Sequence, residues 1–224
     1  MSKGNKKINQ LAAERTIYVV DDDEKVCKLL DDLFTNLDYS VKTYTRALDF
    51  IADFPLANLG CILLDLRMPD MGGLLIQQEI YAIDCHLPII FMTSHADNRS
   101  AVKAIKAGAF DFIDKPINFQ EILDISQTAM QYCEELNEEN KYRESVFERL
   151  NQLTAREKEI CKLFGTGSTT KQTAFKLDIS QRTAEVHRYN IMKKLGVSSI
   201  AELTRLLLVT DDQLFDEINL SDRK

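Results

Sequence analysis

Short apolar runs alternate with amphipathic stretches from residue 16 to residue 138. The runs are continuous rather than alternating, which is typical of parallel strands buried on both faces of a sheet. Strands are predicted at residues 16–20, 40–44, 61–64, 89–92 and 110–113, and helices at 24–37, 46–54, 73–83, 97–107 and 119–138. Five such strand–helix units predict an α/β fold with a doubly wound, five-stranded parallel sheet.

The pattern becomes entirely helical after residue 153. Four segments each begin at a helix-capping signal, and in three of them a Ser or Thr precedes Glu or Gln by three residues, the spacing of a capping box. The capping residues are Thr154, Thr169, Ser180 and Ser199, of which Ser180 lacks that partner. A small all-α domain of four helices leaves room for a helix-turn-helix.

These patterns divide the chain into five parts. Residues 1–14 are predicted to be a flexible tail, 15–135 to form the α/β domain, and 151–209 to form the helical domain. Residues 136–150 are predicted to be a helical linker that could continue the preceding helix, and that either pairs with its copy in a dimer or is solvated. Residues 210–224 form an acidic tail.

Charge is distributed unevenly between the two predicted domains. The net charge of the chain is −7, but residues 14–134 carry 10 basic and 20 acidic groups, whereas residues 150–209 carry 10 basic and 5 acidic groups. A domain of net charge +5 inside an acidic protein indicates that the helical half meets a polyanion.

Cysteine usage and hydropathy indicate the compartment. The chain has five cysteines with no CxxC spacing, which predicts free thiols in a reducing cytoplasm. The N-terminal tail lacks the apolar region of a signal peptide, and no apolar run approaches the roughly 20 residues that span a bilayer. We therefore expect a cytoplasmic protein without a membrane partner.

Acidic residues follow two of the predicted strands. Asp21, Asp22 and Asp23 come directly after the first strand, and Asp65 ends the third. The aspartate triplet alone favours a solvated turn or a helix cap. Asp65 changes this interpretation, because a carboxylate that ends a buried strand is costly without a function. Carboxylates that converge at one sheet edge require a counter-charge, and Mg²⁺ is the expected cofactor.

Two more polar residues end the later strands. Thr93 follows the fourth strand and Lys115 the fifth. Taken singly, each is an ordinary strand-end or loop residue. Together with Asp65 as nucleophile and a metal ion, they are the parts of a phosphoryl-transfer site.

The motifs of this half resemble the receiver domain of two-component response regulators, which has a flavodoxin-like fold. The carrying motifs are VVDDD (19–23), LDLRMPDMGG (64–73), MTS (92–94), GAFDFI (108–113) and KP (115–116). The resemblance implies that a sensor histidine kinase phosphorylates Asp65, which binds Mg²⁺ together with Asp22 and the main-chain carbonyl of Arg67, while Asp21 helps through water. It also implies that Lys115 pairs with the phosphoryl group and that its bond to Pro116 is cis.

The receiver resemblance implies a switch as well. Thr93 would move to hydrogen-bond the phosphoryl oxygen, and the aromatic ring of Phe112 would turn inward into the vacated space. Many receivers have Tyr at the position of Phe112, so this chain lacks the hydroxyl there. The switch would promote a homodimer through the face of helix 97–107 and strand 110–113.

The helical half resembles the LuxR-type helix-turn-helix domain, which places the chain in the FixJ/NarL class. The matching positions are residues 153–157, Lys171, Ala174, Leu177, Ile179, Ser180, Thr183, 186–188, 190–192, 194–197 and 201–203. Thr173, where an aliphatic residue is usual, and Ala184, where Val is common, depart from the pattern.

A recognition helix over residues 181–195 would enter the major groove of double-stranded DNA. Ala184, Ile191 and Leu195 form its buried stripe. Glu185 could accept from a cytosine amine, Val186 could contact a thymine methyl, and His187 either packs, faces phosphate or reads a base. The complete predicted contact set is Lys171, Arg182, Thr183, Glu185, Val186, His187, Arg188, Tyr189, Lys193 and Lys194, in which Arg182, Arg188, Lys193 and Lys194 would bind phosphates.

The sequence therefore predicts a transcription regulator whose partners are a sensor histidine kinase, DNA, RNA polymerase and a second copy of itself. It would not be an enzyme beyond the phosphorylation and dephosphorylation of its own aspartate. A DNA regulator that works without phosphorylation is a rival, but it predicts an eroded acidic pocket. An aspartate-nucleophile phosphatase is a second rival, and it requires a second Asp where this chain has Arg67.

Overall fold

The structure, a computed structural model, describes residues 15–54, 59–83, 87–94 and 98–209. The chain divides into two compact units, residues 1–137 and 138–224. Both predicted tails and Cys85 lie outside the described residues. Within the described ranges, no helix is both long and apolar enough to cross a membrane.

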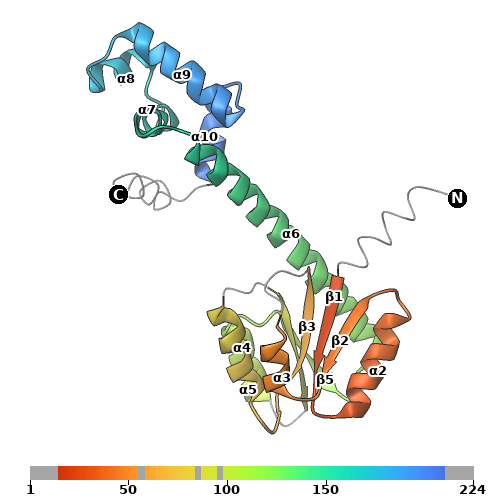
Figure 1. Ribbon diagram of the computed structural model, residues 1–224. Helices are drawn as coiled ribbons and strands as arrows, with labels where there is room; N and C mark the ends of the chain where they lie inside the picture. The colour runs from red at the N-terminus through yellow and green to blue at the C-terminus, as the bar shows by residue number, and fades with distance from the viewer. Residues whose placement is uncertain (1–14, 55–58, 84–86, 95–97, 210–224) are drawn as a thin grey trace, which may run out of the picture. The chain divides into compact units, whose positions relative to one another are not determined.

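The first unit is built on one parallel sheet of five strands in the order β2-β1-β3-β4-β5 (Figure 1). The strands are β1 (Arg15–Val20), β2 (Ser40–Tyr44), β3 (Leu59–Asp65), β4 (Ile89–Ser94) and β5 (Asp111–Lys115). Each begins and ends within two residues of its predicted position. The predicted α/β doubly wound fold is confirmed.

The burial pattern of β2 differs from the prediction. The three central strands β1, β3 and β4 are buried almost throughout, as continuous apolar runs require. Residues of β2 are instead exposed or half-buried, because this strand lies at the edge of the sheet and pairs only with β1. Its sequence, SVKTY, already contains the polar residues that an edge strand tolerates.

Helices cover both faces of the sheet. The helices of this unit are α2 (Glu24–Thr35), α3 (Ala47–Ala52), α4 (Gly73–Ala82), α5 (Asn98–Lys106) and the beginning of α6 (Phe119–Asn151). On one face, Tyr18 and Phe91 pack in a core with Phe50 of α3 and Ile76 of α4. The opposite core contains side chains from β1, β3 and β4, from α2, and from α6. Alternate residues of each central strand therefore face different helices.

Helix α6 runs without a break over 33 residues. The sequence predicted a helix over residues 119–138 and a helical linker over 136–150 that could continue it, and the structure forms one helix over both. Val146 and Leu150, assigned to that linker, are fully buried in the core of the second unit. The last turns of α6 therefore belong to the helical unit, and the predicted boundary at residue 151 lies too late.

The second unit contains the end of α6 and four short helices, α7 (Ala155–Gly165), α8 (Thr170–Lys176), α9 (Gln181–Leu195) and α10 (Ile200–Leu208). Complete capping boxes begin α7 at Thr154 and α8 at Thr169. At α10 the N-cap Ser199 accepts from Glu202 as predicted, but the Glu202 carboxylate accepts from the Ser198 main-chain N–H. Helix α9 ends at Gly196, which has a left-handed conformation (φ 66°) that glycine adopts without a steric cost.

Candidate functional site

The predicted pocket residues lie at the carboxyl edge of the sheet. Asp21 and Asp22 directly follow β1, Asp65 is the last residue of β3, and Lys115 is the last residue of β5. Thr93 lies one residue before the end of β4. Because β1, β3, β4 and β5 are consecutive in the sheet, their ends converge at the position where doubly wound folds hold their ligands.

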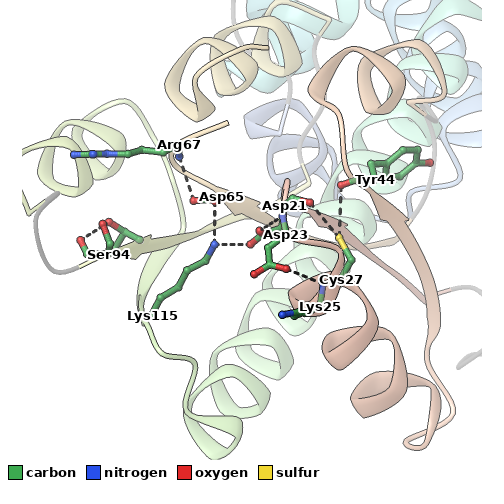
Figure 2. Close-up of polar contacts among 10 residues, drawn as sticks. Asp21, Asp23, Lys25, Cys27, Tyr44, Asp65, Arg67, Ser94 and Lys115 are labelled. Carbon is green, nitrogen blue, oxygen red and sulfur yellow. Dashed lines mark hydrogen bonds and ion pairs between the residues drawn. The ribbon is translucent and has the colours of Figure 1, made fainter. Parts of the chain in front are cut away.

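The Lys115 ammonium lies between two carboxylates (Figure 2). Its Nζ is 2.6 Å from Asp21 Oδ2 and 2.9 Å from Asp65 Oδ2. Asp65 Oδ1 accepts from the main-chain N–H of Arg67 at 3.1 Å. Asp21 is fully buried and Asp65 nearly so. One cation therefore orients both carboxylates, and the backbone after β3 fixes the second oxygen of Asp65.

Burial and charge act in opposite directions on this pair. Burial raises the pKa of Asp21 above its ordinary value, more than the hydrogen bond from Lys115 lowers it. Burial alone would lower the pKa of Lys115, but its hydrogen bonds to Asp21 and Asp65 raise this pKa overall. Lys115 is therefore held in its charged form beside the carboxylate that would become the nucleophile.

The carboxylates also fit a divalent cation. Asp21, Asp22 and Asp65 each place an oxygen within 4.8 Å of the other two. Lys115 pairs with Asp21 and Asp65, so its single positive charge stands against three carboxylates in this cluster. An all-oxygen donor set with excess negative charge suits Mg²⁺, which keeps several waters and needs only one or two carboxylates.

Three residues outside the predicted set support the pocket. Asp23 caps α2 by accepting from the Lys25 N–H, and its own N–H donates to Asp21 Oδ1. The buried thiol of Cys27 donates to the Asp21 main-chain carbonyl at 3.3 Å, and burial raises the pKa of this thiol to about 11. Gly73 begins α4 so close to β3 that a Cβ there would lie 2.6 Å from the Asp65 carbonyl oxygen. In the sequence, the pair Gly72-Gly73 is a signal for such a close approach of the backbone, whereas no sequence signal indicates the role of Cys27.

The predicted switch residues lie on neighbouring strands. Thr93 is buried, and its hydroxyl donates to the Ser94 carbonyl at 3.2 Å. Phe112 is 38% exposed, and in the β4–β5 register it is paired with Phe91, two residues before Thr93. In this arrangement the Phe112 ring is outside the core. The Lys115–Pro116 peptide bond is cis.

The second unit presents a polar face on α9. Ala184, Ile191 and Leu195 are buried, which confirms the predicted stripe. Other side chains of the predicted contact set are exposed, namely Lys171 on α8 and Arg182, Thr183, Glu185, Val186, Tyr189 and Lys193 on α9, whereas His187, Arg188 and Lys194 are half-buried.

Internal contacts occupy some of these side chains. Lys194 Nζ is 2.6 Å from Glu157 Oε2 and donates to the Gln152 carbonyl at 3.2 Å, so its ammonium anchors α9 to the start of α7. The Lys194 ammonium therefore has a structural role within this unit, and its contact with phosphate stays a prediction. The Arg188 guanidinium lies 5.9 Å from the centre of the Phe164 ring. The Thr183 hydroxyl is 2.7 Å from that of the N-cap residue Ser180.

Both units match known families. Residues 17–127 match the response regulator receiver domain, and residues 142–207 match the bacterial regulatory proteins of the luxR family. The response regulator protein TmoT of Ectopseudomonas mendocina is 39% identical over 201 residues, which cover 90% of this chain and 91% of TmoT. The transcriptional regulatory protein FixJ of Rhizobium meliloti is 35% identical over 193 residues, covering 86% of this chain and 95% of FixJ.

Solved structures agree with these matches. The response regulator StyR superposes with a TM-score of 0.79 at 36% identity, covering 88% of this chain and 99% of StyR. Full-length FixJ from B. japonicum has a TM-score of 0.56 at 31% identity, with 88% and 97% covered. The chain therefore belongs to the two-component response regulators in which a receiver domain is joined to a LuxR-family DNA-binding domain.

Proposed function

We propose that a sensor histidine kinase phosphorylates this regulator on Asp65, and that phosphorylation promotes dimerisation and binding to promoter DNA in the cytoplasm. The observation that best supports this proposal is the position of the Asp65 carboxylate. It lies at the end of β3, bonded to Lys115 and beside two further carboxylates. The chain would catalyse only the phosphorylation and dephosphorylation of this aspartate. On DNA it would act on transcription through RNA polymerase.

The chemistry follows from the residues around Asp65. A carboxylate oxygen of Asp65 attacks the phosphorus of the donor, forming an acyl phosphate as the bond from phosphorus to the donor histidine nitrogen breaks. The carboxylates of Asp21, Asp22 and Asp65, with the Arg67 main-chain carbonyl, would hold Mg²⁺, which when bound neutralises phosphoryl oxygens. Lys115, already 2.9 Å from Asp65, pairs with another phosphoryl oxygen. The Thr93 hydroxyl then turns from Ser94 to the phosphoryl group, and Phe112 moves inward.

The phosphoacceptor is tested with acetyl phosphate and Mg²⁺ as a small-molecule donor system. Asp65→Asn should abolish labelling of the protein. Asp70→Asn is the matched control, because Asp70 lies in the loop after β3, where its carboxylate accepts from the Leu48 N–H outside the pocket. Labelling of the Asp65→Asn variant at the wild-type level would refute the assignment. Asp22→Ala should weaken Mg²⁺ binding in a titration, whereas Asp70→Asn should not.

DNA recognition is proposed for the exposed face of α9. Arg182 and Lys193 would bind phosphates, and Glu185 and Val186 would contact base edges. Arg182→Ala should weaken binding to all sequences and reduce the salt-dependence slope by about one. Glu185→Ala should instead change the preferred base at one position of a selected operator. Equal losses on all sequences for both variants would contradict this division of roles.

A further inference from the structure

Helix α5 is packed into the receiver through small side chains. Its fully buried residues among the described side chains are Ala101 and Ala104. Its two larger apolar residues, Val102 and Ile105, are exposed. Because alanines bury little apolar area, the position of α5 depends on its other contacts more than that of a helix anchored by large side chains.

Two polar side chains of α4 hold the C-terminal end of α5. The Gln77 amide nitrogen donates to the carbonyls of Ala104 and Ala107 at 3.3 and 3.2 Å. The Tyr81 hydroxyl donates to the Gly108 carbonyl at 2.6 Å. Figure 1 shows the two helices as neighbours in the receiver. The Ala104 carbonyl also accepts from the N–H groups of Ala107 and Ala109, so the contact with α4 adds to its bonds within the segment. The Ala107 and Gly108 carbonyls lie past the last turn of α5, where helix geometry leaves carbonyls without a partner, and α4 supplies one to each.

The Gln77 side chain is only partly satisfied by this contact. It is 1% exposed, and its amide oxygen has no hydrogen-bond partner in the part of the chain that the structure describes. Exchanging the amide oxygen and nitrogen would place the oxygen against two carbonyl oxygens, so the contacts fix the orientation. A buried oxygen without a partner destabilises the arrangement that contains it. The contact therefore holds α5 at the cost of one buried oxygen that the described residues leave without a partner.

We propose that Gln77 is a positioning residue, a latch from α4 that holds α5 in its unphosphorylated position. The proposal rests on the proposed phosphorylation switch, because α5 lies in the chain between Thr93 of β4 and Phe112 of β5. Release of the latch lets α5, with its exposed Val102 and Ile105, move when Thr93 and Phe112 rearrange. Gln77 does not contact the phosphoryl group. Its hydrogen bonds to α5 add to the free energy that phosphorylation must supply to move this helix.

The test compares the full-length variants Gln77→Met and Gln78→Met with the wild type. Gln78 is the adjacent, exposed residue of the same helix, so it is a matched control. The amide hydrogens of Ala107, Gly108 and Ala109 form the hydrogen bonds that close the end of α5. In unphosphorylated Gln77→Met they should exchange with solvent roughly tenfold faster than in the wild type, the factor expected for losing about two hydrogen bonds. Amides of β1 and β3 should not change, because these strands do not contain the carbonyls that Gln77 bonds.

A second measurement links the latch to the switch. With acetyl phosphate and Mg²⁺, Gln77→Met should dimerise at a several-fold lower protein concentration than the wild type in sedimentation, whereas Gln78→Met should match it. Tyr81→Phe, which removes only one hydroxyl, should speed exchange near Gly108 to a smaller extent.

The outcomes separate the latch from the proposed function. Unchanged α5 exchange in Gln77→Met overturns the latch, and faster exchange throughout the sheet reduces Gln77 to a general core residue, which also overturns it. Faster α5 exchange without easier dimerisation overturns the link to the switch. If the wild type itself neither takes up phosphate nor dimerises, the proposed function fails, while the exchange comparison still decides whether Gln77 holds α5.

Discussion

Thr173 buries a hydroxyl that the described part of the chain leaves without a partner. Its side chain is fully buried at the α8–α9 core. Thr173→Val replaces the hydroxyl by a methyl group of similar size, so it should raise the free energy of unfolding of the DNA-binding unit by about 1 kcal/mol. Urea unfolding followed by NMR signals of α7 to α10 measures this change.

The control for Thr173 is Thr204 in α10. Its hydroxyl donates to the Ile200 carbonyl at 3.0 Å, so Thr204→Val exchanges a satisfied group for a methyl group. This variant should leave stability unchanged or lower it. A gain for both variants would attribute the effect to β-branched apolar side chains in general and not to the unpartnered hydroxyl.

Glu157 should make the stability of the DNA-binding unit depend on pH. Burial would raise its pKa, but hydrogen bonds from Lys194 and Thr154 lower it below the ordinary carboxyl value. A carboxyl whose folded pKa is lowered contributes stability that is complete above its unfolded pKa and is lost as pH falls through the folded pKa. Glu157→Gln should therefore cost about 1–3 kcal/mol at pH 7, and the difference from wild type should shrink as the pH falls below about 4.5.

The matched control for this pH dependence is Glu159→Gln in the same helix. Glu159 is exposed and pairs with Arg156 at 2.6 Å, a surface contact that contributes little to stability. Its variant should follow the wild-type curve of unfolding free energy between pH 7 and pH 3. A Glu157→Gln curve that runs parallel to wild type over this range would contradict the assignment.

At the scale of single residues, the residues of the acidic pocket could be predicted from the sequence, but the residues that support them could not. Asp65, Thr93 and Lys115 could be located because each ends a strand, and strand ends of a parallel sheet converge. The approach of Gly73 to Asp65 and the thiol bond of Cys27 depend on contacts between distant segments. The ion pair of Lys194 with Glu157, 37 residues away in the sequence, was missed for the same reason.

At the scale of elements, α6 is where sequence reasoning was least successful. Its central residues are polar, which resembles a linker, and the buried Val146 and Leu150 appeared only as part of an intermittent stripe. In contrast, β1, β3 and β4 were recognisable because full burial demands an unbroken apolar run. The strand β2 was also located, but its side chains are not fully buried, because it lies at the edge of the sheet and pairs only with β1.

The end of α6 should be required for a stable DNA-binding unit. Val146 and Leu150 are fully buried, and burying such a side chain contributes about 1.5–3 kcal/mol. Arg149 also donates to the Leu195 carbonyl at 3.1 Å and so caps the end of α9. A fragment that begins at residue 138 should therefore unfold cooperatively in urea. One that begins at residue 151 should be destabilised by more than about 3 kcal/mol. Equal midpoints for the two fragments would show that the last turns of α6 are dispensable.

At the scale of the whole molecule, a segment of each unit carries a strong charge of opposite sign. Residues 14–134 have a net charge of −10 and residues 150–209 a net charge of +5, which predicts an attraction between these segments at low salt. We expect the unphosphorylated receiver to mask the face of α9 for part of the time. Phosphorylation then needs to shift this equilibrium by only a few kcal/mol to release the DNA-binding unit.

Masking predicts an order of affinities for DNA. The fragment from residue 138 onward should bind the operator more tightly than the unphosphorylated full-length protein, and the difference should shrink as salt screens the attraction between the units. Binding by the fragment should itself weaken with salt, because Arg182 and Lys193 release counterions when they bind phosphates. The alternative is that the two units are independent, so that only dimerisation controls the binding of DNA. Fluorescence anisotropy of the fragment and of the full-length protein, on one operator at matched salt, separates the two alternatives. Equal affinities would rule out masking, because a receiver that does not cover α9 leaves the contact between one monomer and DNA unchanged.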